Sequence, residues 1–168
     1  MKTTSRWYAF VFVVMGLLMA VSVSSAQDKP QAKLSASAIQ IVPVHSDEVK
    51  IPAEFQMALY EHAIEEIQKT GKFQHVYRDG DKAAADTPDL LILRGDVTGF
   101  KPGSERKRQV TTVAGTTSVT IHCQFVDKTG KVVLERDITG KVRFLGGNLR
   151  ATYDFAKKGA KMVQENFQ

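Results

Sequence analysis

Two stretches in the second half of the chain alternate apolar and polar residues, which predicts two paired β-strands. In the first stretch, apolar side chains occupy every second position: Val119, Ile121, Cys123 and Phe125. In the second stretch, they fall on one side of the strand: Val132, Leu134, Ile138, Val142 and Phe144. Residues 127–130 (DKTG) between them have the composition of a hairpin turn. The alternation indicates one buried face and one polar face, and the polar face meets either water or a partner.

Shorter apolar runs predict three further strands, at residues 38–44, 73–77 and 90–100. The string Leu90-Leu91-Ile92-Leu93 is apolar on both faces, which is typical of an interior strand that is covered on both sides. Residues 78–88 are polar, rich in alanine and contain a proline, so they are predicted to form a loop.

Apolar residues at helical spacing predict two amphipathic helices. In the first, Pro52 suits the opening turn, Gly71 ends the helix, and the apolar stripe consists of Phe55, Leu59, Ala63 and Ile67. In the second, Asn148 is the expected N-cap, and the stripe consists of Leu149, Tyr153, Ala156, Ala160, Val163 and Phe167.

Together these elements predict an α+β fold. It is a two-layer sandwich in which two helices pack on one face of a mostly antiparallel sheet of about five strands. The order of the strands does not follow from the sequence. Residues 38–168 are expected to form a single α+β domain, because their length suits one hydrophobic core. Residues 27–37 are polar with little pattern, and we expect them to form a flexible lead-in.

Residues 1–26 have the layout of a secretory signal peptide. Lys2 and Arg6 precede an uncharged, mostly apolar run at residues 7–21, and Ser24-Ser25-Ala26 supplies small residues for a signal peptidase. The run has 15 residues, whereas a membrane-spanning helix needs about 20. We therefore expect cleavage after Ala26, export to the periplasm and no transmembrane segment after cleavage.

Charge and cysteine content narrow the function classes. Residues 27–168 hold 21 basic and 18 acidic residues, and so small an excess gives no argument for binding nucleic acid. The single cysteine, Cys123, excludes an internal disulfide, so the domain relies on its core for stability. Its place in the alternating strand predicts a small core hydrophobe in preference to a reactive thiol.

Strings that match the motifs of two enzyme classes occur in the sequence, and both matches fail on their context. The DKTG string at residues 127–130 matches the phosphorylated aspartate motif of ion-pumping ATPases, but the nucleotide and membrane domains of that class are missing. Ser104-x-x-Lys107 and the KTG of residues 128–130 match motifs of penicillin-binding enzymes. The gap between them is too short for that fold.

A metal site could begin at His45, Asp47 and Glu48. Zinc sites need three or four converging N or S ligands, and the other histidines of the sequence show no ligand spacing. The sequence also contains no Walker loop, nucleophile elbow or dinucleotide fingerprint. We therefore predict no catalytic, cofactor-binding or metal-binding residues.

Residues 101–108 contain four basic residues and one acidic residue, Glu105. The basic residues are Lys101, Arg106, Lys107 and Arg108. One interpretation is a solvated hairpin tip. The other is an interaction loop for an anionic envelope component, such as phospholipid head groups, polysaccharide or an acidic protein. The second interpretation predicts binding that weakens as salt is added.

Several strings of the chain resemble a bacterial family of exported proteins of unknown function, number 4410. They are residues 89–104 (DLLILRGDVTGFKPGS), with their strongest part at residues 94–104, then Ala114-Gly115 and residues 119–133 (VTIHCQFVDKTGKVV). The resemblance covers about residues 38–168. It implies an envelope protein and offers no catalytic residues to carry over. Some members are lipoproteins, but this chain lacks the lipoprotein cysteine. The architecture is similar to small α/β domains of envelope assembly proteins, such as the curli secretion lipoprotein and the N-terminal domain of the Tol-system propeller protein.

These observations favour a non-enzymatic interaction or assembly module of the cell envelope. It would bind an envelope protein or itself through a sheet edge or the polar sheet face. An alternative is an envelope hydrolase or transferase with acid and base groups at Asp96, His122 and Asp127, which requires these residues to converge in a pocket. A third hypothesis is an anion-binding surface at residues 101–108.

Overall fold

The structure is a computed structural model that describes residues 33–111, 114–143 and 146–168. The predicted signal peptide and Phe144 lie outside these residues. Ala32–Gln168 forms one compact unit. Among the described residues, no helix combines the length and the apolar character that crossing a bilayer requires. The elements of the described chain are β1 (Ala38–Ile41), α1 (Ala53–Lys69), β2 (His75–Arg78), α2 (Lys82–Asp86), β3 (Leu90–Lys101), α3 (Glu105–Val110), β4 (Thr117–Asp127), β5 (Val132–Val142) and α4 (Arg150–Asn166).

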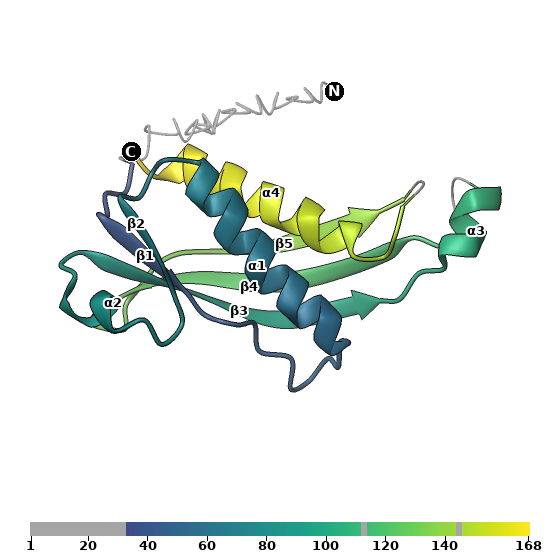
Figure 1. The fold of residues 1–168 in the computed structure, drawn as a ribbon, viewed down its shortest axis with the longest axis horizontal. Helices are drawn as coiled ribbons and strands as arrows, with labels where there is room; N and C mark the ends of the chain where they lie inside the picture. Colours follow the sequence, from purple (N-terminus) through teal and green to yellow (C-terminus); the bar gives the residue numbers. More distant parts are fainter. Residues whose placement is uncertain (1–32, 112–113, 144–145) are drawn as a thin grey trace, which may run out of the picture. The chain divides into compact units, whose positions relative to one another are not determined.

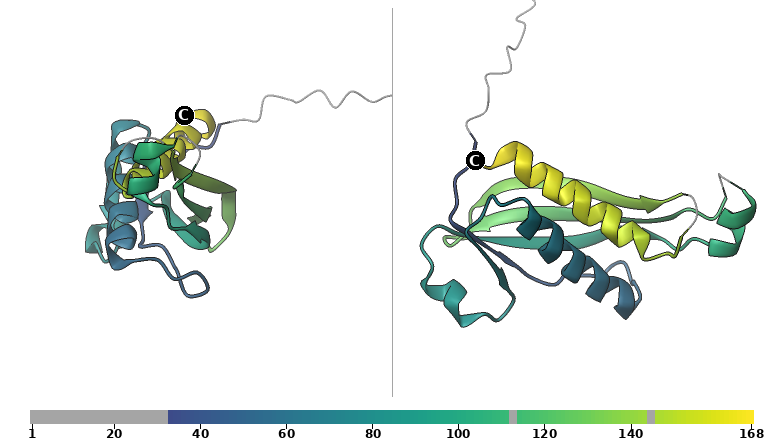
Figure 2. Two further views of the ribbon diagram at one scale, coloured as in Figure 1. Left: turned by 90° about the vertical axis from the view of Figure 1, so that its right-hand side faces the viewer. Right: turned by 45° about the horizontal axis from the view of Figure 1, so that its top comes forward.

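The five strands form one sheet in the order β2-β1-β3-β4-β5. β1 runs parallel to both β2 and β3, whereas β3, β4 and β5 are antiparallel. The long helices α1 and α4 lie side by side on the same face of the sheet (Figure 1, Figure 2). This confirms the predicted α+β sandwich with two helices on one face of a mostly antiparallel sheet.

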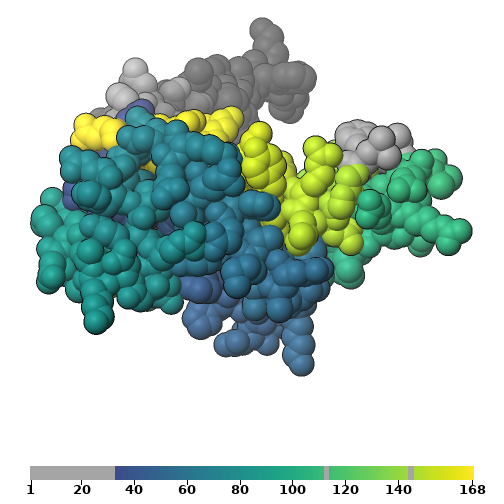
Figure 3. All heavy atoms as spheres, in the orientation of Figure 1, coloured from purple at the N-terminus to yellow at the C-terminus, as the bar shows by residue number. Residues whose placement is uncertain are grey.

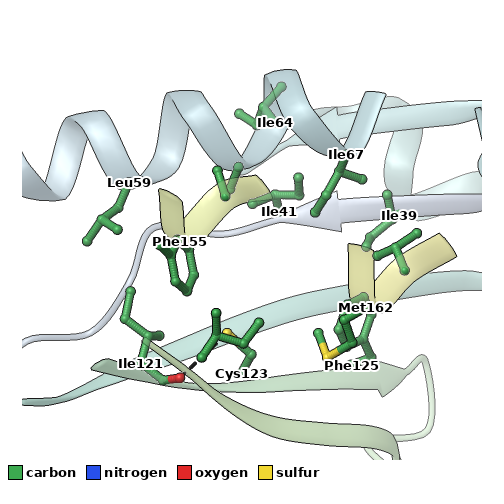
Figure 4. Close-up of a cluster of buried hydrophobic side chains, with 14 of the residues drawn as sticks. Ile39, Ile41, Leu59, Ile64, Ile67, Ile121, Cys123, Phe125, Phe155 and Met162 are labelled. Carbon is green, nitrogen blue, oxygen red and sulfur yellow. Dashed lines mark hydrogen bonds between the residues drawn. The ribbon is translucent and has the colours of Figure 1, made fainter. Parts of the chain in front are cut away.

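The main core lies between this sheet face and the two helices, as Figure 4 shows. Because side chains alternate along a strand, β4 sends Val119, Ile121 and Phe125 into the core, where each is 0% exposed. The Phe125 ring packs against Phe167 beyond the end of α4, with ring centroids 5.4 Å apart. The alternation of the sequence therefore identified the buried face of the sheet correctly.

A smaller core lies on the opposite face, under α2. Ala84 of α2 is buried against Ala38 of β1 and Leu90 of β3, and Tyr77 and Ile92 pack beside them. This second layer explains why the β3 run is apolar on both faces. The prediction of a loop at residues 78–88 is therefore wrong at Lys82–Asp86, which forms a short helix. The Asp81 side chain accepts a hydrogen bond from the Ala83 N–H and caps that helix.

The predicted ends of the long helices are right in one case and wrong in another. Gly71 follows α1 with φ +64°, the left-handed conformation expected of a glycine that ends a helix. Asn148 is not the N-cap of α4, because the residue before its first turn is Leu149 and no side chain caps it. The Asn148 side chain instead accepts hydrogen bonds from Arg108 and Thr117, which hold it toward the end of the sheet.

Part of the expected flexible lead-in is fixed in place. The Leu34 N–H donates to the Asn166 carbonyl at 2.8 Å, and the Gln168 N–H donates to the Leu34 carbonyl at 3.1 Å. Leu34 also packs against the main core. A lone apolar residue in a polar segment gave no periodic signal, so the sequence could not show this contact.

Cys123 should be nearly inert in the folded protein. It is 3% exposed, and burial raises the pKa of its thiol to about 12 from a usual value of 9.0. Because the thiolate is the reactive form, we expect a thiol-specific reagent to react about a thousandfold more slowly than with a free thiol. The rate should return to that of a free thiol in denaturant. Fast labelling of the native protein would contradict this burial.

Candidate functional site

On the sheet face opposite α1 and α4, the described helices leave the strands β3, β4 and β5 largely uncovered. On β3, β4 and β5 the side chains that point away from α1 and α4 are polar and form rows across the sheet. We call this surface the open face, and its residues are Arg94, Asp96, Thr98, Ser118, Thr120, His122, Gln124, Glu135, Asp137, Thr139 and Lys141. One row joins Thr120 and Thr139, whose hydroxyl oxygens are 3.0 Å apart. Such cross-strand pairs hold the polar side chains in fixed positions.

His122 is the centre of the most charged row. Its Nδ1 lies 2.7 Å from Asp137 Oδ1, and its Nε2 lies 3.7 Å from Glu135 Oε2. Asp96 is its register partner on the other side, in β3. The hydrogen bond to Asp137 and the charges of all three carboxylates raise the pKa of His122 above its usual 6.5. The open face thus carries a histidine that stays protonated to a higher pH than usual.

Replacing Asp137 with asparagine should lower the pKa of His122, measured by NMR titration of its ring protons. The pairing makes the pKa higher in the folded protein than in the unfolded chain. Its stabilising contribution is therefore fully present below the unfolded pKa and is lost as the pH rises through the folded pKa. Denaturant unfolding on either side of this range should show that dependence in the wild type and less of it in Asp137→Asn. Glu135→Gln is the control, and its effect should be smaller because Glu135 is farther from the ring. An unchanged pKa in Asp137→Asn would contradict the pairing.

The residues proposed for a hydrolase or transferase do not all converge. Asp96 and His122 are neighbours on the open face, but Asp127 is the last residue of β4, five positions beyond His122. At about 3.3 Å per residue this is roughly 17 Å. The Asp127 carboxylate accepts hydrogen bonds from the N–H and hydroxyl of Thr129 and from the Lys131 N–H. These bonds lower its pKa and make it part of the turn.

The strings that match penicillin-binding enzymes lie at opposite ends of the sheet. Ser104 precedes α3, and its hydroxyl accepts a hydrogen bond from the Lys107 N–H at 3.4 Å. The KTG string lies in the β4–β5 turn, where Gly130 adopts φ +87°. The whole length of β4 separates the two, so they cannot form one site.

His45 and Asp47 line a hollow of about 250 Å³ beside Asp96. His45 Nδ1 and Asp47 Oδ2 are 3.9 Å apart, and both side chains are largely exposed. Within the described ranges, no three His, Cys, Asp or Glu side chains are grouped closely enough to hold a metal ion. Glu48 and Asp96 also line the hollow, but the four side chains form no complete coordination shell.

β5 is an outer strand of the sheet, and α4 covers part of its free edge. Asp154 accepts a hydrogen bond from the Lys141 N–H, and Lys158 donates one to the Thr139 carbonyl, each at 2.8 Å. Both contacts occupy backbone groups in the second half of β5 that an added strand would otherwise use. Beside them, β5 and α4 enclose a hollow of about 430 Å³, lined by Arg136, Asp137, Ile138, Thr139, Lys141, Lys158, Lys161, Met162 and Glu165.

The predicted basic loop contains a short helix, α3, which projects beyond the end of the sheet (Figure 1). The chain folds tightly at its base, because a side chain at Gly103 would meet the Thr117 N at 2.6 Å. Lys101, Arg106 and Lys107 are exposed.

Arg108 departs from the prediction of an exposed basic residue, because it is only 4% exposed. Its Nη1 donates to the carbonyl of Gly115 at 2.5 Å and to the hydroxyl of Thr117 at 3.1 Å. Its Nη2 donates to the carbonyl of Gly146 and to Asn148 Oδ1, both at 2.8 Å. One guanidinium thus joins α3, the start of β4 and the segment that leads into α4.

Comparisons with known proteins show a fold shared with PelC. Two structures of the PelC dodecamer from Paraburkholderia phytofirmans, one of them a single-residue variant, superpose with TM-scores of 0.57 and 0.56. Their sequence identities to this chain are 14% and 15%. The first covers 82% of this chain and 96% of PelC, and the variant covers 83% and 93%. At this identity the likeness shows the fold alone.

No family model matches the chain, and no curated protein sequence matches it either. The resemblance to family number 4410 is therefore not confirmed.

Proposed function

We propose that this protein is a non-enzymatic assembly module of the cell envelope that associates with copies of itself or with an envelope protein. The open face carries this proposal. It presents fixed rows of polar and charged side chains on β3, β4 and β5, which no helix of the described chain covers. The absence of a converged acid, base and nucleophile among the expected catalytic residues supports a binding role over a hydrolytic one.

Self-association has a second support in PelC, which forms a dodecamer and shares the fold. The free edge of β5 offers a route for strand addition. Because Asp154 and Lys158 cover the second half of β5, an added strand would pair with the first half, near Glu135 and Asp137. These residues also belong to the open face, so the edge and the face form one continuous surface.

The oligomeric state of the protein purified from its host tests this proposal. Light scattering during size exclusion should show a concentration-dependent oligomer. Gln124→Arg combined with Thr139→Arg places two bulky cations on the open face and should shift the protein toward the monomer. Gln68→Arg combined with Gln164→Arg adds the same charge to exposed positions of α1 and α4 and should leave the oligomer intact.

Two results would contradict the proposal. One is a monomeric wild type that also captures no envelope protein after cross-linking in the host. The other is equal loss of the oligomer in both double variants, since that would reflect added charge and not the open face.

We also propose that the protein acts after export to the periplasm, without residues 1–26. The charge, the apolar run and the small residues before Gln27 support this. The intact mass of the protein isolated from its host should correspond to a chain that begins at Gln27. A mass that includes residues 1–26 would contradict cleavage after Ala26.

A further inference from the structure

Basic residues concentrate at one end of the sheet, at a surface that we call the basic tip. It comprises Lys101, α3, Arg143 and residues 146–150. The basic tip contains six basic residues and one acidic residue, Glu105. The rest of residues 27–168 contains 15 basic and 17 acidic residues. The positive charge of the sequence from residue 27 onward therefore comes from this end alone, which gives the molecule a strong charge asymmetry.

The basic tip is held in a fixed arrangement by Arg108. The four hydrogen bonds of its guanidinium tie α3 to the segment at residues 146–148. Arg150 packs against the same segment, since a Cβ on Gly146 would lie 2.8 Å from Arg150 Nη1. Gly146 thus contacts two arginine side chains, accepting a hydrogen bond from Arg108 through its carbonyl and lying against Arg150.

Within the part of the chain that the structure describes, no acidic side chain pairs with Arg108. All four acceptors are neutral carbonyl, hydroxyl or amide oxygens, and its Nε is buried with no hydrogen-bond partner. Buried arginines usually pair with a carboxylate, because an isolated buried charge is unfavourable. The one acidic residue of the basic tip, Glu105, is exposed at the start of α3. The positive charge of the basic tip is therefore available to attract an anion from outside the protein.

Two aliphatic side chains are exposed among these charges. Val110, the last residue of α3, is 81% exposed, and Leu149 is 39% exposed. Leu149 directly follows Asn148, which Arg108 holds. Figure 3 shows the side chains of α3 projecting beyond the body of the domain. Exposed aliphatic side chains on the same short segments as lysine and arginine suit the boundary between phospholipid head groups and acyl chains. A purely polar anion such as a polysaccharide would gain nothing from Val110.

We propose that the basic tip docks on the surface of an anionic phospholipid membrane. Lys101, Arg106 and Lys107 face the phosphate groups, while Val110 enters the interface. Arg108 acts as a positioning residue that fixes α3 and adds its uncompensated charge to the field. The basic tip uses a different surface from the open face, so this inference goes beyond the proposed function and does not depend on it.

Vesicle co-sedimentation tests the inference. The protein from its host should bind vesicles of phosphatidylglycerol and phosphatidylcholine and should not bind vesicles of phosphatidylcholine alone. Each basic residue near such a surface contributes about a fivefold change in partitioning. Lys101→Gln, Arg106→Gln and Lys107→Gln together should lower partitioning on the order of 100-fold. The same substitutions at Lys72, Lys82 and Lys131, away from the basic tip, are the matched control and should have a much smaller effect.

Two further measurements distinguish binding to a membrane from binding to other anions. Val110→Ser keeps the charge of the basic tip but removes the two methyl groups that would enter the interface. This variant should therefore bind anionic vesicles several-fold more weakly. Inorganic phosphate should displace the protein no better than chloride at equal ionic strength. Stronger displacement by phosphate would overturn the inference and indicate a small-anion site. Equal losses in the two triple variants, or no binding to anionic vesicles, would also overturn it.

A failure of the membrane inference can be distinguished from a failure of the proposed function. The basic-tip triple variant should keep the oligomeric state of the wild type, because Arg106 and Lys107 lie on α3 and Lys101 is the last residue of β3, at the margin of the open face beside Ser118. Loss of a protein partner in that variant, without any binding to vesicles, would assign the basic tip to an acidic protein and overturn the membrane assignment.

Discussion

Replacing Arg108 with methionine should lower the free energy of unfolding by about 2–4 kcal/mol. The substitution removes four hydrogen bonds at the meeting point of α3, β4 and the segment before α4. The Gly115 carbonyl keeps the Ser104 N–H as a donor and Asn148 Oδ1 keeps the Thr117 hydroxyl, whereas the Gly146 carbonyl loses its Arg108 donor. Each lost hydrogen bond costs about 1 kcal/mol, and removal of the uncompensated charge offsets part of the loss. Denaturant unfolding followed by circular dichroism measures the change.

Arg106→Met and Lys107→Met are the controls for this result. Both side chains are exposed neighbours on α3, so each change should stay within about 0.5 kcal/mol. Arg108→Lys is a sharper variant, because it keeps the charge but replaces the fork of five donors by one ammonium. It should be nearly as unstable as the methionine variant. A stable lysine variant would show that charge, and not the bridging geometry, matters at this position.

Gly140→Ala should destabilise the protein by about 3 kcal/mol or more, the upper range for overpacking. Gly140 lies in β5 where the first turn of α4 crosses the strand. A Cβ at this position would collide with the Ala151 carbonyl and approach Phe155 Cβ to 2.7 Å. Because these contacts involve the backbone of α4, no side-chain rotation relieves them, and the helix must move away from the sheet. Thermal unfolding should show the loss as a lower Tm.

Gly159→Ala is the matched control, since it makes the same change within α4. Its new Cβ would lie 3.8 Å from Ile138 Cδ1, an ordinary contact distance. Alanine favours the helix over glycine by about 0.5–1 kcal/mol, so this variant should be slightly more stable than the wild type. Equal effects of the two alanines would show that α4 does not pack on β5 as described.

Local periodicity predicted the elements that have one buried and one exposed side. β4, β5 and α1 each have one face in the core and one face toward solvent, so their apolar residues recur at a regular spacing. The parallel pairing of β1 with β2 and β3 could not be read in this way. It depends on α1 crossing over the sheet between β1 and β2, which is a property of the whole chain and not of any short window.

The candidate site was harder to predict for a related reason. Arg108 lies in a run of basic residues whose other members are exposed, and Glu105, three residues before it, has the helical spacing of an ion pair, but Arg108 bonds elsewhere. Its partners are backbone carbonyls, a hydroxyl and an amide from segments up to 40 residues away. Any residue can supply a carbonyl, so no local sequence pattern indicates that these groups converge on Arg108. His122 differs, because the hairpin register follows from the turn and places Asp137 beside it.

The contact between Leu34 and Phe167 makes the domain almost a closed ring of polypeptide. The first and last segments that the structure describes lie together at the end of the sheet away from α3 (Figure 1). A short linker from Gln168 to Leu34 would close the ring, and the exposed turn at Thr129-Gly130 is a natural place to reopen it. Such a circular permutant would move both termini to the β4–β5 turn while leaving the open face and the basic tip unchanged.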